Sequence, residues 1–198
     1  MHLVPDPKVS FAAFFVRDRR KTAMRTLVAH HGIDWLKLKH AEGVRGCVVF
    51  DIDDTIINGN DAVTNGFDAM RVLLQEATLL KFPVRIVTAR PDDPKSVTDA
   101  VSMLRKRGFN VPASMVHYLP AHLWGKDTRH VEDFKWQKHL DFVKEHGAVI
   151  ARFGDKLWDV AHRDSLRTYL GHVDDKDCYI FFDPRLGGTL SGKLPGLA

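Results

Sequence analysis

The chain has few of the residues that cross-link small secreted proteins or bind structural zinc. It contains two cysteines, Cys47 and Cys178, which are too few for a disulfide framework or a four-ligand thiolate zinc site. Both stand in apolar runs, so we expect them to be small core residues. The eleven histidines are scattered, and no H-E-x-x-H pair occurs, which leaves a zinc-hydrolase interpretation without support.

Long hydrophobic runs are also missing, since none approaches the roughly 18 residues needed to span a bilayer. The opening MHLVPDPKVSFAAFFVRDRR is not a good signal peptide, because its apolar piece is short and three arginines follow it. We therefore expect a cytoplasmic protein without a membrane partner. The net charge of +4 permits a polyanionic partner without requiring one. The densest basic cluster is equally well explained as a solvated helix face or as a phosphate-contacting patch. It comprises Arg17, Arg19, Arg20, Lys21 and Arg25.

The first part of the chain has a helical pattern. Apolar residues recur at helical spacing over residues 10–31, and Gly32 is expected to end this helix. A second short helix is expected around Trp35. We predict that residues 1–45 form an N-terminal helical appendage and that residues 46–198 form the main domain.

After Gly46, short β-rich runs alternate with amphipathic helical segments. This alternation predicts the α/β class, a three-layer, Rossmann-like parallel sheet with helices on both faces. Ligand sites in such sheets lie at the carboxyl ends of the strands, where Asp51, Thr88 and Asp155 fall. The expected strands are 47–52, 84–88, 115–119, 149–153 and 178–182, and the expected helices are 63–81, 94–107, 132–146 and 157–170.

The segment VVFDIDDTIING combines a buried strand with three carboxylates within four residues. Crowded like charges at the end of a buried strand cost free energy unless a cation neutralises them or a turn points them into water. Asp51 and Asp53, two residues apart and followed by Thr55, are arranged as expected for a carboxylate nucleophile beside an acid/base carboxylate. The simpler alternative is an Asp-rich turn.

Three further signals favour the catalytic interpretation. Thr88 follows a strand and offers a hydroxyl that could hold a phosphoryl oxygen. Lys135 lies at the start of an expected helix, where its charge could balance nearby carboxylates. The fourth expected strand ends in Gly154-Asp155, followed by Asp159. Acidic residues at the ends of two neighbouring strands provide the oxygen ligands that Mg²⁺ prefers.

The ordered set of these residues resembles the haloacid dehalogenase (HAD) superfamily of phosphotransferases. Each motif is short, but the four occur in the required order and strand context, over about residues 46–182. The D-x-D-x-T motif matches Asp51, Asp53 and Thr55, the second motif Thr88, the third Lys135, and the G-D-x-x-x-D form of the fourth Gly154, Asp155 and Asp159.

The resemblance implies a phosphatase, since phosphatases of the family carry an Asp two residues after the nucleophile. It implies that Asp51 forms an aspartyl-phosphate and that Asp53 protonates the leaving oxygen. Mg²⁺ would be bound by the Asp51 and Asp155 carboxylates and the Asp53 carbonyl, with Asp159 supporting the metal. Asp54 stands where Gly is commoner, as in some acid phosphatases of the family.

Further residues are assigned to the transferring group and the substrate. The resemblance implies that Thr88 holds the transferring group and that Lys135 offsets its charge. Thr55, Arg90 and Arg129 are expected to contact substrate, although a surface arginine in a polar loop is an equally good account of Arg129.

The short connections around Thr88 indicate a minimal cap and an open site. The loop 122–135 resembles the G-D-T-R-x-x-D-x-x-K region of the phosphatase domain of phage polynucleotide kinase/3′-phosphatases. Asp127, Thr128 and Arg129 match, whereas Gly125 is offset by one residue and the fourth motif is G-D rather than D-D. The first substrate expected is therefore a nucleotide or nucleic-acid 3′-phosphate. The alternatives are small metabolites, phosphoproteins, or a non-catalytic module that binds phosphate or nucleic acid.

Overall fold

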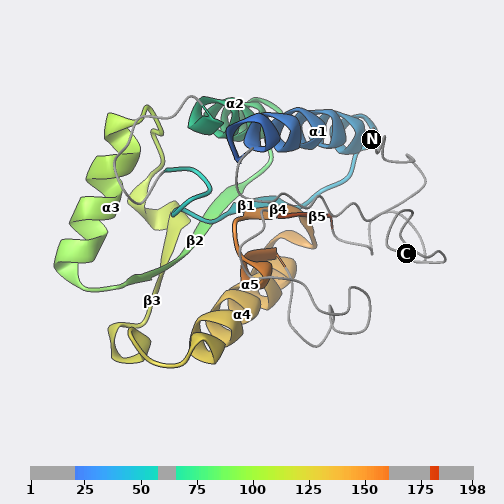
Figure 1. Ribbon diagram of the computed structural model, residues 1–198. Helices are drawn as coiled ribbons and strands as arrows, with labels where there is room; N and C mark the ends of the chain where they lie inside the picture. The colour runs from blue at the N-terminus through green and yellow to red at the C-terminus, as the bar shows by residue number, and fades with distance from the viewer. Residues whose placement is uncertain (1–20, 58–65, 161–178, 183–198) are drawn as a thin grey trace, which may run out of the picture.

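The computed structural model describes residues 21–57, 66–160 and 179–182, which form an α/β fold with helices on both faces of one sheet (Figure 1). Expected helical residues 10–20 and 161–170, Cys178 and the side chains of the basic cluster lie outside the described residues. No helix in the described ranges has the length and apolar character needed to cross a membrane. The strands are β1 (Cys47–Phe50), β2 (Val84–Pro91), β3 (Val116–Leu119), β4 (Val149–Gly154) and β5 (Tyr179–Phe182), and the helices are α1 (Lys21–Ala41), α2 (Gly66–Leu79), α3 (Pro94–Lys106), α4 (Thr128–His146) and α5 (Leu157–Val160), with short 3₁₀ turns η2 (Ala113–Met115) and η3 (Ala121–Leu123).

The sheet has the strand order β3-β2-β1-β4-β5, which places β1 at its centre. Strands β1 to β4 are parallel, as the sequence predicts. The expectation that the fifth strand is also parallel is wrong, because β5 runs antiparallel to β4. An antiparallel strand added at one edge of a parallel sheet is a common arrangement. The parallel strands bring their carboxyl ends to the same edge, and the site lies there.

Strand β1 is buried on both faces, which explains its continuous apolar sequence. Val48 and Phe50 face the larger core cluster, which also holds residues of α1, α2 and α3. Cys47 and Val49 face the smaller cluster together with Phe142 of α4. Because side chains alternate along a strand, the next position on the α4 side is 51.

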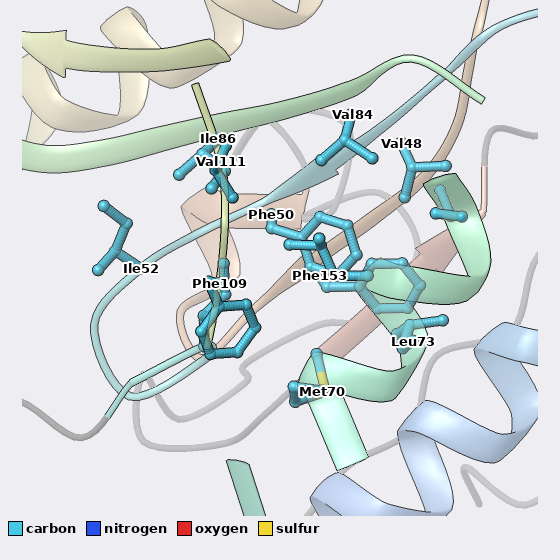
Figure 2. Packing of buried hydrophobic residues seen from close by; sticks show 14 of the residues in the cluster. Val48, Phe50, Ile52, Met70, Leu73, Val84, Ile86, Phe109, Val111 and Phe153 are labelled. Atoms are coloured by element: carbon cyan, nitrogen blue, oxygen red, sulfur yellow. The ribbon is translucent and has the colours of Figure 1, made fainter. Parts of the chain in front are cut away.

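Phenylalanines from the two central strands stack on each other within the larger core (Figure 2). The rings of Phe50 and Phe153 stack with centroids 5.0 Å apart. Helix α1 shares this core, since Trp35 and Leu36 are buried in it. The Trp35 Nε1–H donates to the carbonyl of Ile150 on β4 at 3.2 Å. Helices α1 and α2 lie side by side on one face of the sheet, and α4 covers the other (Figure 1).

Gly32 does not end the first helix, contrary to the expectation from sequence. Helix α1 continues through it to Ala41, so the separate helix expected around Trp35 is part of α1. A Cβ at position 32 would lie 3.0 Å from Leu73 Cδ1 and Phe153 Cζ. The glycine is therefore a point of close packing of α1 on α2 and β4, which the chain pattern alone does not distinguish from a helix stop.

The start of α4 and the end of β2 also differ from the expectation, so Lys135 and Thr88 lie at other positions within these elements than the sequence predicts. Helix α4 begins at Thr128, where Asp127 caps it by accepting from the Arg129 amide, and not near position 132. Lys135 is thus about two turns into the helix rather than at its start. Strand β2 continues past Thr88 to Pro91, with a register irregularity between these residues.

Candidate active site

The first part of the site is the end of β1, where Asp51 follows Phe50. The Asp51 amide donates to the carbonyl of Phe153 on β4 at 2.8 Å, so the backbone remains tied to the sheet at this position. Strand alternation directs residue 51 to the α4 side, and the residue is only 6% exposed. A carboxylate at this place is rigid and largely removed from water.

The chain then makes a tight turn over residues 52–57. The amides of Ile56 and Ile57 donate to the carbonyl of Ile52 at 2.9 and 3.0 Å. Asp54 adopts φ 55°, the left-handed region in which glycine is favoured and Asp is better tolerated than most residues. Gly would adopt this backbone conformation without strain, and Asp is one of the few other residues that tolerate it. Thr55 is buried in the same turn.

The turn predicts a specific order of stability for substitutions at position 54. We expect Asp54→Ala to be less stable than Asp54→Gly by about 1 kcal/mol, because in the left-handed region the Cβ of Ala lies too close to the following carbonyl oxygen, whereas Gly has no Cβ. Asp54→Asn keeps the shape and removes the charge, so it separates backbone strain from electrostatics. Urea unfolding of the three variants measures the order. An Ala variant as stable as the Gly variant would contradict the assigned conformation.

Lys135 of α4 joins the carboxylates that follow β1 and β4. Its ammonium donates to Asp51 Oδ1 at 2.6 Å and also bonds to Asp159 Oδ1. All three residues are buried. Burial by itself lowers the pKa of Lys135, because it disfavours the charged ammonium. The carboxylates of Asp159 and Asp51 outweigh this effect and raise the pKa of Lys135 above its ordinary value. The lysine is therefore a fixed positive charge beside Asp51.

Gly154 permits Asp159 to reach this position. A Cβ at residue 154 would lie 2.1 Å from the Asp159 Cβ, which is too close for two non-bonded carbon atoms. The Asp159 carboxylate also accepts a hydrogen bond from the Lys156 amide at 2.8 Å through Oδ2. Both oxygens of Asp159 are thus engaged by protein donors, one from α4 and one from its own turn. Asp159 is therefore well placed to orient the ammonium of Lys135.

Three carboxylates form the acidic part of the site. Asp51, Asp155 and Asp159 each place one oxygen within 4.8 Å of the others. Burial, and the neighbouring carboxylates that Lys135 only partly offsets, raise the pKa of Asp51 well above its ordinary value. Burial and then the Asp159 carboxylate raise the pKa of Asp155 to about 7. The raised pKa values show that the ionised carboxylates are disfavoured without a further counter-charge. A bound cation would supply that charge, and the oxygen donors of the cluster suit Mg²⁺.

On the other side of the turn, Arg90 binds Asp53 with two hydrogen bonds. Its Nε donates to Asp53 Oδ2 at 2.9 Å and its Nη2 to Asp53 Oδ1 at 2.6 Å. The Arg90 amide donates to Thr88 Oγ1 at 3.2 Å, and Thr88 is fully buried. The carboxylate of Asp53 is 41% exposed, so it stands at the open side of the site. Hydrogen bonding to Asp53 is the main cause of the raised pKa of Arg90.

Arg129 does not join these residues. It is exposed in the first turn of α4 and pairs with Asp127, the cap of the same helix, at 2.6 Å. Among the described residues, no hydrogen bond or ion pair links it to the acidic cluster. The other expected site residues lie in the turn after β1, at the end of β2 and just after β4, and Lys135 reaches them from α4.

Sequence reasoning missed three parts of the site. It assigned Arg90 to substrate and did not identify its pairing with Asp53, for which the T-A-R sequence at the end of β2 was the available signal. It also missed the amide of Lys156 that holds Asp159. The third is the packing requirement for Gly154, because the motif names the glycine without giving its reason.

Comparisons with known proteins identified no relative of this chain. No protein-family model matches the chain, and no curated protein or solved structure matches it. The class of protein is defined by the fold, an α/β sheet of four parallel strands and one antiparallel edge strand flanked by helices, with a lysine-bridged carboxylate cluster at the carboxyl ends of its central strands.

Proposed function

We propose that the protein is a Mg²⁺-dependent phosphomonoesterase of the HAD type that acts through an aspartyl-phosphate intermediate. The observation that carries this proposal is the buried pair of Asp51 and Lys135, 2.6 Å apart, beside the carboxylates of Asp155 and Asp159. A nucleophilic carboxylate needs a rigid position and a means of offsetting the charge of the incoming phosphate. Asp51 has both, because β4 holds its backbone and Lys135 stands beside it.

The cation would be bound by the carboxylates of Asp51 and Asp155 and by the backbone carbonyl of Asp53. When bound, Mg²⁺ would neutralise charge on the carboxylates and on the phosphoryl oxygens. Both oxygens of Asp159 already accept hydrogen bonds, from Lys135 and from the Lys156 amide, which supports an orienting role for this residue rather than direct coordination.

In the proposed reaction, an Asp51 oxygen attacks phosphorus, and the bond from phosphorus to the leaving oxygen breaks. Asp53 supplies a proton to that oxygen, so the product leaves as an alcohol. Asp53 then accepts a proton from the water that attacks the aspartyl-phosphate, which releases inorganic phosphate and restores Asp51. The partial exposure of Asp53 supports this role, because the leaving group and water must both reach it.

The remaining polar groups support binding of the phosphoryl group. Thr88 and Arg90 lie two residues apart at the end of β2, and the Arg90 guanidinium, which binds Asp53, is a planar group of the kind that also binds phosphate oxygens. The first substrate class is a nucleotide or a nucleic-acid 3′-phosphate, with small phosphorylated metabolites or phosphoproteins as the alternative. A non-catalytic binding module would not require a nucleophile, an acid/base carboxylate and a buried lysine together.

Metal removal tests the proposal. Chelation by EDTA is expected to abolish phosphate release from a panel of phosphate monoesters, and Mg²⁺ is expected to restore it. Independently of activity, Mg²⁺ should raise the thermal unfolding midpoint of the wild type, since binding at 100 times Kd adds about 2.7 kcal/mol to stability. Asp155→Asn should lose most of this shift, whereas Asp99→Asn, a surface control on α3, should retain it. A wild type that neither hydrolyses any ester nor responds to Mg²⁺ would contradict the proposal.

A further inference from the structure

Two of the contacts between cations and carboxylates in the site differ in how far they are open to water. Lys135 bonds to Asp51 and Asp159, and these three side chains are 3%, 7% and 1% exposed. The side chains of Arg90 and Asp53 are 21% and 41% exposed. A buried ion pair is costly to open, because no water replaces the lost partner, whereas a partly exposed pair contributes little and opens readily. The first contact is therefore a permanent part of the site, and the second can be exchanged.

Arg90 occupies both oxygens of the Asp53 carboxylate. Its Nε donates to Oδ2 at 2.9 Å and its Nη2 to Oδ1 at 2.6 Å. In the proposed reaction an oxygen of Asp53 must meet first the leaving oxygen and then the attacking water. The guanidinium stands where these groups have to approach, so the contact with Arg90 describes a resting arrangement of the site and not the one in which Asp53 acts.

The Arg90 guanidinium is also placed to receive a phosphate. Its backbone is fixed, because its amide donates to Thr88 Oγ1 at 3.2 Å, so only the long side chain has to move. Hydrogen bonding to Asp53 is the main cause of the raised pKa of Arg90, and the charge of Asp51 adds to it. The cation therefore lies within electrostatic reach of the proposed nucleophile. A phosphate monoester carries more charge and more acceptor oxygens than a carboxylate, so it competes well for a guanidinium.

We propose that the substrate phosphate displaces Asp53 from Arg90, so that the guanidinium moves onto the phosphoryl oxygens and Asp53 becomes available to the leaving oxygen. The inference rests on the proposed function and adds an order of events to it, since Asp53 is released only when a phosphate is present at Asp51. In the free protein the pair keeps the acid/base group engaged, and the substrate itself completes the site. Lys135 takes no part in the exchange, because both of its carboxylate partners are buried with it.

Calorimetric titration with inorganic phosphate in the presence of Mg²⁺ tests the exchange without any turnover. Arg90→Met should weaken phosphate binding by about tenfold, through loss of a charge-assisted contact. Asp53→Ala should tighten it by about two- to fivefold, because binding no longer has to open the pair. In the double variant the benefit of Asp53→Ala should be smaller, since no pair remains to be opened.

The matched control is Arg85→Met. Arg85 lies on the same strand and pairs with Glu145 at 2.6 Å, so its replacement removes an arginine of β2 that belongs to a different ion pair. Phosphate affinity should be unchanged in this variant. An unchanged affinity in Arg90→Met, or an equal effect of Asp53→Ala with and without Arg90, would overturn the inference.

Turnover of a series of aryl and alkyl phosphates separates this inference from the proposed function. If the exchange occurs, Arg90→Met should raise KM and lower kcat/KM by a similar factor for good and poor leaving groups. If Arg90 instead stays on Asp53 and orients it, the variant should lose kcat mainly on poor leaving groups while its phosphate affinity is retained. That result would reject the exchange and leave the phosphatase proposal standing. If no ester is hydrolysed but the phosphate affinities change as expected, the phosphatase proposal fails and the exchange between Arg90 and Asp53 remains.

Discussion

Replacement of Asp51 with Asn is expected to lower kcat by at least about 10³-fold on every phosphate monoester that the wild type hydrolyses, since the amide cannot act as the nucleophile. The fold should survive, because Lys135 keeps its bond to Asp159 and the substitution removes a buried charge that is costly to desolvate. Phosphate release measures the first effect, and circular dichroism with thermal unfolding measures the second. The combination of an intact fold and lost turnover is what a catalytic carboxylate predicts.

A covalent intermediate can be tested in the wild type by adding an acceptor alcohol. An aspartyl-phosphate on Asp51 would partition between water and the alcohol in a ratio that does not depend on the leaving group of the substrate. Asp141→Asn, which changes a carboxylate on the outer part of α4, should keep both the rate and the ratio. Activity in Asp51→Asn close to the wild-type value, or a ratio that changes with the leaving group, would contradict the mechanism.

Replacement of Lys135 with Met is expected to be the most destabilising of these substitutions. It retains the length and apolar stem of the side chain, but it leaves Asp51 and Asp159 buried without their shared counter-charge. Breaking a buried ion pair from one side costs about 3–5 kcal/mol. Urea unfolding should show the loss in the absence of Mg²⁺, and part of it should return with Mg²⁺, because the cation substitutes for some of the missing charge.

Restoring charge balance separates the electrostatic effect of Lys135 from its packing. In a cycle of Lys135→Met, Asp159→Asn and the double variant, we expect the double variant to be more stable than Lys135→Met alone. Lys138→Met is a matched control on α4, since its partner Asp141 is partly exposed and surface pairs contribute little. If Lys135→Met and Lys138→Met cost the same, Lys135 would not be balancing a buried cluster.

The sequence predicts most of the sheet because apolar alternation is a local property. The runs around Val48, Val84, Val116 and Val149 all form strands of the expected parallel sheet. The antiparallel direction of β5 was not predictable, because a short apolar run has the same pattern in either direction. The predicted helix boundaries were wrong where one residue type is used for two purposes. Gly32 was expected to end a helix, but in the structure it is a packing contact inside α1.

By itself the sequence indicated which polar residues belong to the carboxyl edge of the sheet, since Asp51 and Asp155 directly follow apolar runs that read as strands. Only the tertiary structure decided which groups touch. Arg90 binds Asp53 across 37 positions, and Lys135 bonds to Asp51 across 84. The physical reason is that periodicity encodes which face a residue occupies, whereas contacts between distant residues depend on how strands align and helices pack.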